Sequence, residues 1–571
     1  MRVRLPNRVA IALVAAGILA AACTSEPVGG PSVGPTRGTG PSALRFTDVA
    51  QQVGLDFQHG AFRWDVIPDV AAMMGGGVCW LDYDGDGWLD LFVVNSYAEA
   101  EAGRWRDEGG LPHSALFHNL EGRFEDVSAG SGADLATRGT GCVAADFDLD
   151  GSMDLYVTSA GVGALLWNEG DGTFTEGAGP AGVNASGWYA GGAVGDVNRD
   201  GWPDLFLAGY ADVNTDLPDA SLGFPTTKLG VRDLLFLSAG PAEGGHVTFR
   251  EVGAEAGLEV VGFEYGLGAV FSDLDRDGDL DLFVANDTKP DRLYENVPWP
   301  GGVDADPVGL GFRFEELAAR AGVADPAAGM GVAEGDYDGD GRPDLFVTNA
   351  RGQMHGAFRG QDSELVKPSF ADVRQELGPD LGSSTGWGVS WADFDLDTDL
   401  DLLFANGNIP VTDLVTDAEP LQMLENLTSQ GRTGVFEDAS GEVGLGAVGS
   451  LDARGSAVAD YDNDGDLDVA INSIGGQLVL LENSGVTGNW LEVELNGFAP
   501  GAVVTAVLAD GRRLVREVHT GSSYLSSEDP RCHFGLGTIS TVNELIVRWP
   551  SGEETRLTDV DGNWLIEVRP P

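Results

Sequence analysis

A nine-residue acidic pattern constrains this chain more than any other feature of its sequence. In its first copy, which runs from Asp82 to Asp90, aspartates occupy positions 1, 3, 5 and 9, and Gly87 occupies position 6. Six further copies follow, so that seven loops provide 28 such positions, of which 27 are Asp and one is Asn. In chain order these positions are Asp82, Asp84, Asp86 and Asp90; Asp146, Asp148, Asp150 and Asp154; Asp196, Asn198, Asp200 and Asp204; Asp273, Asp275, Asp277 and Asp281; Asp336, Asp338, Asp340 and Asp344; Asp393, Asp395, Asp397 and Asp401; and Asp460, Asp462, Asp464 and Asp468.

This spacing predicts a calcium site in each loop. Ca²⁺ takes six to eight oxygen ligands, and alternating carboxylates around a tight turn direct their oxygens toward one centre. We expect up to seven Ca²⁺ ions with a structural role, and a regulatory calcium switch is the alternative. Water and the main-chain carbonyl at position 7 would complete each site. The position 7 residues are Trp88, Ser152, Trp202, Asp279, Arg342, Asp399 and Asp466.

The loops are not EF-hands, although an EF-hand begins with the same residues. That motif requires a bidentate Glu at position 12 and flanking helices, whereas position 12 is Val93 in the first loop and Val157 in the second. A short apolar segment precedes each loop, and a β-rich run such as 91–94 follows it. Each loop therefore reads as the turn of a β-hairpin.

Two further repeated elements complete the unit. Seven segments begin with Phe and carry Gly eight residues later. Five other segments carry Leu followed, after one or two residues, by Asn. A unit of strand, loop, strand, Asn segment and Phe segment corresponds to one four-stranded propeller blade. The fold prediction is all-β: a seven-bladed propeller, closed because the Phe46 segment supplies the last strand of the seventh blade. The Phe positions are Phe46, Phe124, Phe174, Phe249, Phe314, Phe370 and Phe436.

The formal net charge of −57 limits the classes of partner. Seven Ca²⁺ ions would offset 14 of these charges, and the remainder would still repel nucleic acid and anionic membrane surfaces. Cysteine usage does not indicate a disulfide scaffold. Cys79 and Cys142 occupy apolar strand positions, which favour buried thiols, with a disulfide between neighbouring blades as the alternative.

The first 22 residues have the parts of an export signal: basic residues, an apolar run and a small-residue end before Cys23. The Cys resembles the lipidation site of a bacterial lipoprotein, and residues 23–43 read as a Gly/Pro/Ser-rich tether. We expect an exported protein that is lipid-anchored at the cell envelope or cell surface through Cys23. The predicted organisation is signal 1–22, tether 23–43, propeller 44–487 and a C-terminal domain 488–571.

The repeats resemble the FG-GAP/VCBS repeats of integrin-α-type propellers, which carry calcium in such hairpins. The sixth loop departs from the pattern, because Thr398 stands where the other loops have Gly. A β-branched residue resists positive φ, so we expect the sixth site to be weaker than the others or empty. The segments 516–524, 532–537 and 547–552 resemble the ASPIC/UnbV domain of the cartilage acidic protein family and its bacterial relatives.

Catalytic motifs are sparse in the sequence. Neither an HExxH zinc motif nor a GxSxG nucleophile elbow occurs. We therefore predict a cell-surface binding or adhesion module for a protein or polysaccharide partner. The alternatives are a polysaccharide- or secondary-metabolite-acting enzyme and a purely structural envelope protein. Two stretches exceed the repeat template and are candidate partner sites: the segment with His59, Arg63, Trp64 and Asp65, and residues 211–232 with Lys228.

Overall fold

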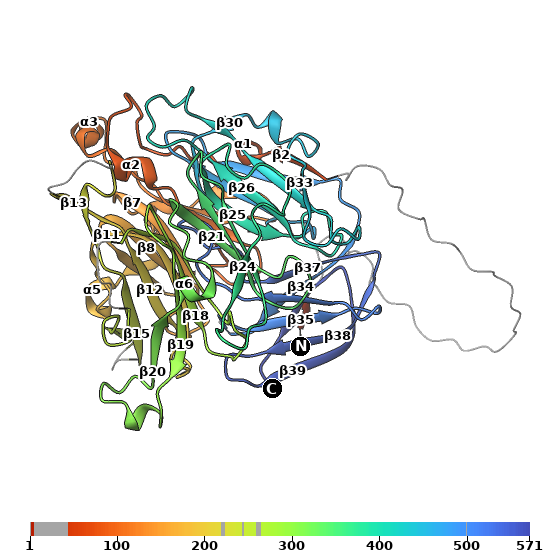
Figure 1. Cartoon of the computed structure of the whole chain (residues 1–571). Coiled ribbons are helices and arrows are strands. Elements are labelled where there is room, and N and C mark those ends of the chain that lie inside the picture. Colours follow the sequence, from red (N-terminus) through yellow and green to blue (C-terminus); the bar gives the residue numbers. More distant parts are fainter. Residues whose placement is uncertain (1, 5–43, 218–222, 242–244, 259–263, 498) are drawn as a thin grey trace, which may run out of the picture.

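The computed structural model describes residues 2–4, 44–217, 223–241, 245–258, 264–497 and 499–571. The predicted export signal, Cys23 and the tether lie outside this part of the chain, apart from Arg2–Arg4. The described chain is dominated by antiparallel strands with a few short helices, so the all-β prediction is confirmed. Figure 1 shows the C-terminal strands in blue beside the repeats, with α2 and α3 at the opposite end of the molecule.

Within the described residues the strands form seven antiparallel groups of four, which we call units 1–7. Units 2 and 3 are continuous as one sheet, because β8 also pairs with β11. Units 1 to 4 contain β3 (Val78–Leu81), β4 (Asp90–Val93), β5 (Ala115–Asn119) and β6 (Phe124–Asp126); β7 (Gly139–Ala145), β8 (Asp154–Val162), β9 (Ala164–Asn168) and β10 (Phe174–Glu176); β11 (Ser186–Gly195), β12 (Asp204–Gly209), β15 (Leu234–Pro241) and β16 (Val247–Glu251); and β17 (Gly266–Ser272), β18 (Asp281–Asn286), β19 (Arg292–Pro298) and β20 (Phe312–Glu316).

Units 5 to 7 repeat this order, and the last unit takes its fourth strand from the N-terminal side of the chain. As predicted, β2 pairs with β33, with Phe46 opposite Asn483. These units contain β21 (Gly329–Gly335), β22 (Asp344–Asn349), β23 (Gly356–Gly360) and β24 (Phe370–Asp372); β25 (Gly386–Ala392), β26 (Asp401–Asn406), β28 (Gln422–Asn426) and β29 (Phe436–Asp438); and β31 (Ala453–Ala459), β32 (Asp468–Ser473), β33 (Val479–Ser484) and β2 (Arg45–Asp48).

The remaining strands form two C-terminal sheets and two small ribbons. One sheet contains β34 (Asn489–Leu495), β37 (Cys532–Gly537), β40 (Trp564–Val568) and β1 (Arg2–Arg4), and the other contains β35 (Val503–Val507), β36 (Arg513–Glu517), β38 (Thr541–Arg548) and β39 (Glu554–Asp561). The ribbons are β13 (Ala211–Asp216) with β14 (Lys228–Gly230), and β27 (Glu419–Pro420) with β30 (Ser450–Leu451). The helices are α1 (Ala50–Val53), α2 (Val70–Met74), α3 (Ala102–Asp107), α4 (Ser128–Ser131), α5 (Ala178–Ala181) and α6 (Ala318–Ala321), with 3₁₀ turns η2 (Glu99–Glu101), η3 (Val303–Ala305) and η4 (Leu445–Ala447).

The Asn of the repeated Asn segment links neighbouring units. The Asn119 side-chain amide donates 2.9 Å to the Leu89 carbonyl of its own unit and 2.8 Å to the Tyr461 carbonyl of unit 7. Asn168 likewise donates 2.7 Å to the Tyr83 carbonyl of unit 1. Since a buried amide left without partners is costly, this Asn fixes its own loop against the preceding unit in the five units that carry it. The same contact recurs from Asn296 to Val197, from Asn426 to Tyr337 and from Asn483 to Phe394.

The repeated Gly permits a second close approach between units. Gly54 has φ 104°, and a Cβ there would lie 2.3 Å from the Phe124 carbonyl oxygen of unit 1. Any side chain at this position would collide with the neighbouring Phe strand.

The inner strands contact one another in cyclic order: β3, β7, β11, β17, β21, β25, β31 and again β3. A C-terminal segment, 520–527, packs against this ring. The Ser523 N–H donates to the Val332 carbonyl, the Cys142 N–H donates to the Leu525 carbonyl, and the Tyr524 hydroxyl donates 3.0 Å to the Met74 carbonyl of α2. Tyr524 and Leu525 belong to an apolar cluster with Met73, Met74, Trp188 and Trp387. The Gly-Ser-Ser-Tyr stretch therefore anchors the C-terminal sheets to several units at once.

One sequence prediction was wrong. Cys79 of β3 and Cys142 of β7 form a disulfide, with their Cα atoms 6.2 Å apart, rather than two buried thiols. Both positions are apolar and buried, as expected, but the ring brings adjacent inner strands within bonding reach. Cys532 is a free, buried cysteine.

Candidate metal centres

The seven acidic loops share one backbone design. In each loop the N–H of position 6 donates to the carboxylate of position 1, as from Gly87 to Asp82 at 2.9 Å, and the N–H of position 7 donates to position 5, as from Trp88 to Asp86 at 2.8 Å. The turn therefore folds around its own carboxylates. The position 1 acceptors in the other loops are Asp146, Asp196, Asp273, Asp336, Asp393 and Asp460, and the position 5 acceptors are Asp150, Asp200, Asp277, Asp340, Asp397 and Asp464.

Position 6 takes a positive φ in every loop, which explains the Gly there. The value is 90° at Gly87 and 98° at Gly465. Thr398 adopts 94°, so the sixth loop keeps the common conformation despite its β-branched residue. The Thr398 hydroxyl accepts a hydrogen bond of 2.5 Å from Arg512, which immediately precedes β36 of the C-terminal domain. That contact holds the residue in a conformation that is unfavourable for threonine.

Position 9 is the most buried acidic position in six of the seven loops, and it is also buried in the seventh. Asp90 has none of its surface exposed, and its carboxylate accepts the Tyr83 N–H at 3.1 Å and the Asn119 N–H at 2.8 Å. It thus joins the start of its loop to the third strand of the unit. The other position 9 residues are also buried and accept an N–H from the third strand of their unit: Asp154, Asp204, Asp281, Asp344, Asp401 and Asp468.

The electrostatics of the loops favour a bound cation. Burial, together with the charge of neighbouring carboxylates, raises the pKa of Asp82, Asp146, Asp196 and Asp336 to about 6. Burial raises the pKa of Asp90 to about 9. Such carboxylates are unfavourable as anions unless a cation neutralises them.

The side-chain oxygens converge as a metal site requires. Ligand atoms of Asp82, Asp84 and Asp90 lie within 4.8 Å of one another, and so do those of Asp146, Asp148 and Asp154 and those of Asp273, Asp275 and Asp277. The acidic clusters can therefore hold metal ions, and their all-oxygen chemistry suits Ca²⁺.

Several loops also contact a cationic or imidazole side chain. His118 Nε2 lies 3.0 Å from Asp84, and His246 Nδ1 lies 2.7 Å from Asp148. In the fourth loop Arg548 contacts Asp273 at 2.6 Å and Arg199 contacts Asp279 at 2.7 Å. The loops are therefore similar in backbone but unequal in how far protein groups already offset their charge.

The two predicted partner stretches differ in structure. His59 is buried, and burial lowers its pKa to about 3, so this residue is not a surface contact. Arg63 and Trp64 instead form what we call the Trp64 cluster, with Arg104 and Trp105 of α3: the two indole rings lie 4.9 Å apart, and Arg104 lies 4.3 Å from the Trp64 ring. In the second stretch, Lys228 Nζ donates to the Val213 carbonyl at 2.7 Å, and residues 218–222 lie outside the described chain.

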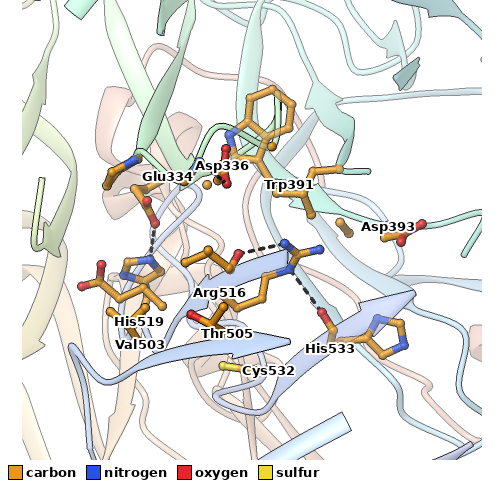
Figure 2. Close-up of a pocket in the computed structure, with 18 of the residues that line it drawn as sticks. Glu334, Asp336, Trp391, Asp393, Val503, Thr505, Arg516, His519, Cys532 and His533 are labelled. Carbon is orange, nitrogen blue, oxygen red and sulfur yellow. Dashed lines mark hydrogen bonds and ion pairs between the residues drawn. The ribbon is translucent and has the colours of Figure 1, made fainter. Parts of the chain in front are cut away.

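A second candidate site, which sequence reasoning missed, lies between the repeats and the C-terminal sheets. This junction cavity has a volume of about 760 Å³ and is lined by Glu334, Arg516, Glu517, His519 and Glu528 among others. Figure 2 shows Glu334 above His519, with Arg516 in the centre of the view. One sequence signal was present: Glu334 stands two residues before its loop, where the other units have apolar residues, namely Trp80, Ala144, Val194, Phe271, Trp391 and Val458.

Two family models match different parts of the chain. The model described as "FG-GAP-like repeat" matches residues 82–157, 146–207, 273–347 and 336–404, and the model described as "ASPIC and UnbV" matches residues 492–571. The chain carries FG-GAP-like repeats and an ASPIC and UnbV domain.

Similar proteins include cartilage acidic protein 1 from Homo sapiens, 28% identical over 407 residues that cover 67% of this chain and 54% of the relative. The Mus musculus protein of the same name is 28% identical over 389 residues, 64% of this chain and 52% of the relative. The chain thus spans about half the length of these relatives. A solved Agrocybe aegerita lectin, described as recognising non-reducing terminal N-acetylglucosamine, aligns with a TM-score of 0.38 and 14% identity, covering 66% of this chain and 88% of the lectin.

In the described part of the chain, no helix has the length and apolar character needed to cross a lipid bilayer.

Proposed function

We propose that this protein is a calcium-braced, seven-bladed β-propeller that acts as a binding module for a protein or polysaccharide partner. The observation that supports the proposal is the repeated loop. Each loop buries its position 9 carboxylate, and in the first, second and fourth loops the carboxylate oxygens converge on a common centre. Up to seven Ca²⁺ ions would be held by the acidic side chains and the position 7 carbonyls. Each ion would join the hairpin of a blade to its third strand.

The cyclic contacts support the propeller arrangement. The inner strands follow one another in a ring, β2 completes the unit that precedes unit 1, and Asn119 links unit 1 back to unit 7. A ring of this kind leaves no open sheet edge between the first and last units.

Thermal unfolding tests the role of calcium. We would measure the melting temperature of the purified protein in chelator and then with increasing Ca²⁺ or Mg²⁺. A ligand present at 100 times its dissociation constant adds about 2.7 kcal/mol per independent site, so several sites together should raise the melting temperature strongly, and Ca²⁺ should act more strongly than Mg²⁺. No calcium-specific increase would refute the proposal.

The Trp64 cluster is the surface that best fits a partner. Two indole rings in contact, inclined at 60° and flanked by the exposed Arg63 and Arg104, offer apolar area beside cationic groups. Aromatic and Arg side chains dominate the binding energy of many interfaces. In pull-down and solution-binding assays with envelope proteins and polysaccharides, we expect Trp105→Ala to weaken partner binding at least about tenfold.

Trp202→Ala is the matched control, because Trp202 is partly exposed but lies in the third acidic loop, where only its main chain is assigned a role. Equal losses in the two variants, or none in Trp105→Ala, would exclude the Trp64 cluster as the binding surface.

We also propose export and lipid anchoring through Cys23, on the basis of the N-terminal sequence. Incorporation of labelled fatty acid into the protein, and its loss in Cys23→Ala, would test this assignment.

An enzyme is the second candidate function, and the junction cavity is the observation that favours it. Glu334, Glu517 and Glu528 lie outside the acidic loops and line a cavity. Carboxylates that are not engaged by calcium are available for other chemistry.

A further inference from the structure

The junction cavity contains a cluster that combines nitrogen and oxygen ligands, unlike the calcium loops. His519 Nε2 contacts Glu334 Oε2 at 2.5 Å, and ligand atoms of Glu334, Glu517 and His519 all lie within 4.8 Å of one another. Glu334 comes from β21 of unit 5, whereas Glu517 and His519 come from the C-terminal domain. The cluster therefore forms only when the C-terminal sheets pack on the repeats.

Groups outside the cluster hold each of its members in place. His519 Nδ1 lies 3.2 Å from the Phe271 carbonyl of unit 4, so an Nδ1–H donor there leaves the Nε2 lone pair directed at the cluster. The imidazoles that bind metals usually donate their second nitrogen to such an oxygen. Glu517 accepts hydrogen bonds from the Ser272 hydroxyl at 3.0 Å and from the Asp273 N–H at 3.2 Å.

The cavity wall also carries nitrogen atoms that have no hydrogen-bond partner among the described residues. His533 lines the cavity, is buried, and has no hydrogen bond at Nδ1 within the described chain. Arg516 donates to the His533 carbonyl and to the Val515 carbonyl, while its Nη2 has no partner among the described residues. Unpaired buried donors are costly, and a guanidinium bonded only to main-chain carbonyls remains able to bind an anion.

We propose that Glu334, Glu517 and His519 bind one divalent first-row transition-metal ion, with an open coordination position facing the junction cavity. Imidazole favours Zn²⁺ and its neighbours over Ca²⁺ and Mg²⁺, which prefer oxygen ligands. Three protein ligands leave room for water or substrate, as in catalytic rather than structural zinc sites. Arg516 would hold an anionic group of a bound molecule, such as a carboxylate or phosphate.

The alternative is an ion pair between a protonated His519 and Glu334 with no metal, and a titration separates the two. We would titrate Zn²⁺ into the full-length protein in saturating Ca²⁺, which occupies the acidic loops, and follow heat. We would then use Co²⁺ and follow visible absorption. We expect one tight equivalent and the ligand-field bands of cobalt in a low-symmetry N/O site.

Substitutions assign the ions to this cluster. His519→Ala and Glu517→Gln should each weaken the tight site about a hundredfold or more. His246→Ala is the matched control, because His246 also contacts a carboxylate, Asp148, but on the second acidic loop. It should leave the tight site unchanged. The calcium-dependent melting temperature of each variant reports whether the repeats remain folded, and Glu334→Gln provides a second, milder ligand variant.

The absence of a tight equivalent in the wild-type protein would overturn the proposal. So would a tight site that is lost in His246→Ala and kept in folded His519→Ala and Glu334→Gln variants. Neither result depends on the partner proposed for the Trp64 cluster.

Discussion

In the acidic loops, carboxylates crowd a turn of nine residues, and their main hydrogen-bond partners are N–H groups of the same unit. In the junction cavity, glutamates from distant segments lie beside His519 and near Arg516. Nearby groups thus offset the negative charge of the loops only in part, whereas the junction cavity contains cationic side chains of its own. On the proposals made above, bound calcium would stabilise the repeats, whereas a ligand in the junction cavity would serve the function of the protein.

The largest expected effect is a fall in stability with rising pH that occurs in chelator but not in calcium. The carboxyls of Asp82 and Asp146 have pKa values raised to about 6, and that of Asp90 is raised to about 9. Above pH 4 the folded state without metal therefore binds more protons than the unfolded state, so its stability falls as pH rises through 6 toward 9. Across seven loops we expect a loss on the order of several kcal/mol.

Melting curves at pH 6 and pH 9, in chelator and in Ca²⁺, check this prediction. Calcium replaces the protons and should remove most of the fall. A similar fall in both conditions would mean that the loops are not calcium sites, or that their charges are offset in another way.

A substitution in the fifth loop should have a smaller effect on the free energy of unfolding, and the sign of this effect should differ between chelator and calcium. In the third loop Asn198 already occupies position 3 and accepts the Asp200 N–H at 2.9 Å, as Asp338 accepts the Asp340 N–H at 3.2 Å in the fifth loop. Asp338→Asn should therefore keep the fold of its loop. It should raise stability in chelator by about 0.5–1 kcal/mol, because it removes a crowded charge, and lower the gain from calcium.

The reverse substitution, Asn198→Asp, is the matched control and should show the opposite signs. The free energy of unfolding of both variants is measured in chelator and in calcium. A change of the same sign in the two conditions would contradict the charge argument.

Substitutions in the junction cavity should change stability by the same amount in chelator and in calcium. Glu334 is almost fully buried beside His519, so Glu334→Gln should cost about 2 kcal/mol in chelator and in Ca²⁺ alike. Glu315→Gln, which loses an exposed pair with Arg313, should cost about 0–1 kcal/mol. A loss in Glu334→Gln that appears only in calcium would link the cavity to the loops and remove the distinction between them.

The two regions also differed in how far the sequence predicted them. The loops were predictable because their ligands are local and the spacing recurs seven times, and the Phe46 pairing followed from counting the same elements. Glu334 and His519 are 185 residues apart and meet only through packing of the C-terminal sheets. The Cys79–Cys142 disulfide was only the alternative prediction for a related reason, because apolar strand positions suit a thiol or a disulfide until the distance between the inner strands is known.

The sixth loop belongs to both regions and should give only a modest effect. Thr398 holds φ at 94° and accepts a hydrogen bond from Arg512, while Asp393 of the same loop lines the junction cavity. Thr398→Gly relieves a backbone strain of about 1–3 kcal/mol and loses one hydrogen bond worth about 1 kcal/mol. We therefore expect a net gain of about 1 kcal/mol, measured by unfolding in Ca²⁺. Thr398→Ala keeps the strain and loses the hydrogen bond, so it should be less stable than the wild type. If Thr398→Gly and Thr398→Ala reduce stability equally, the contact with Arg512 rather than the backbone strain determines the effect of substitution at this position.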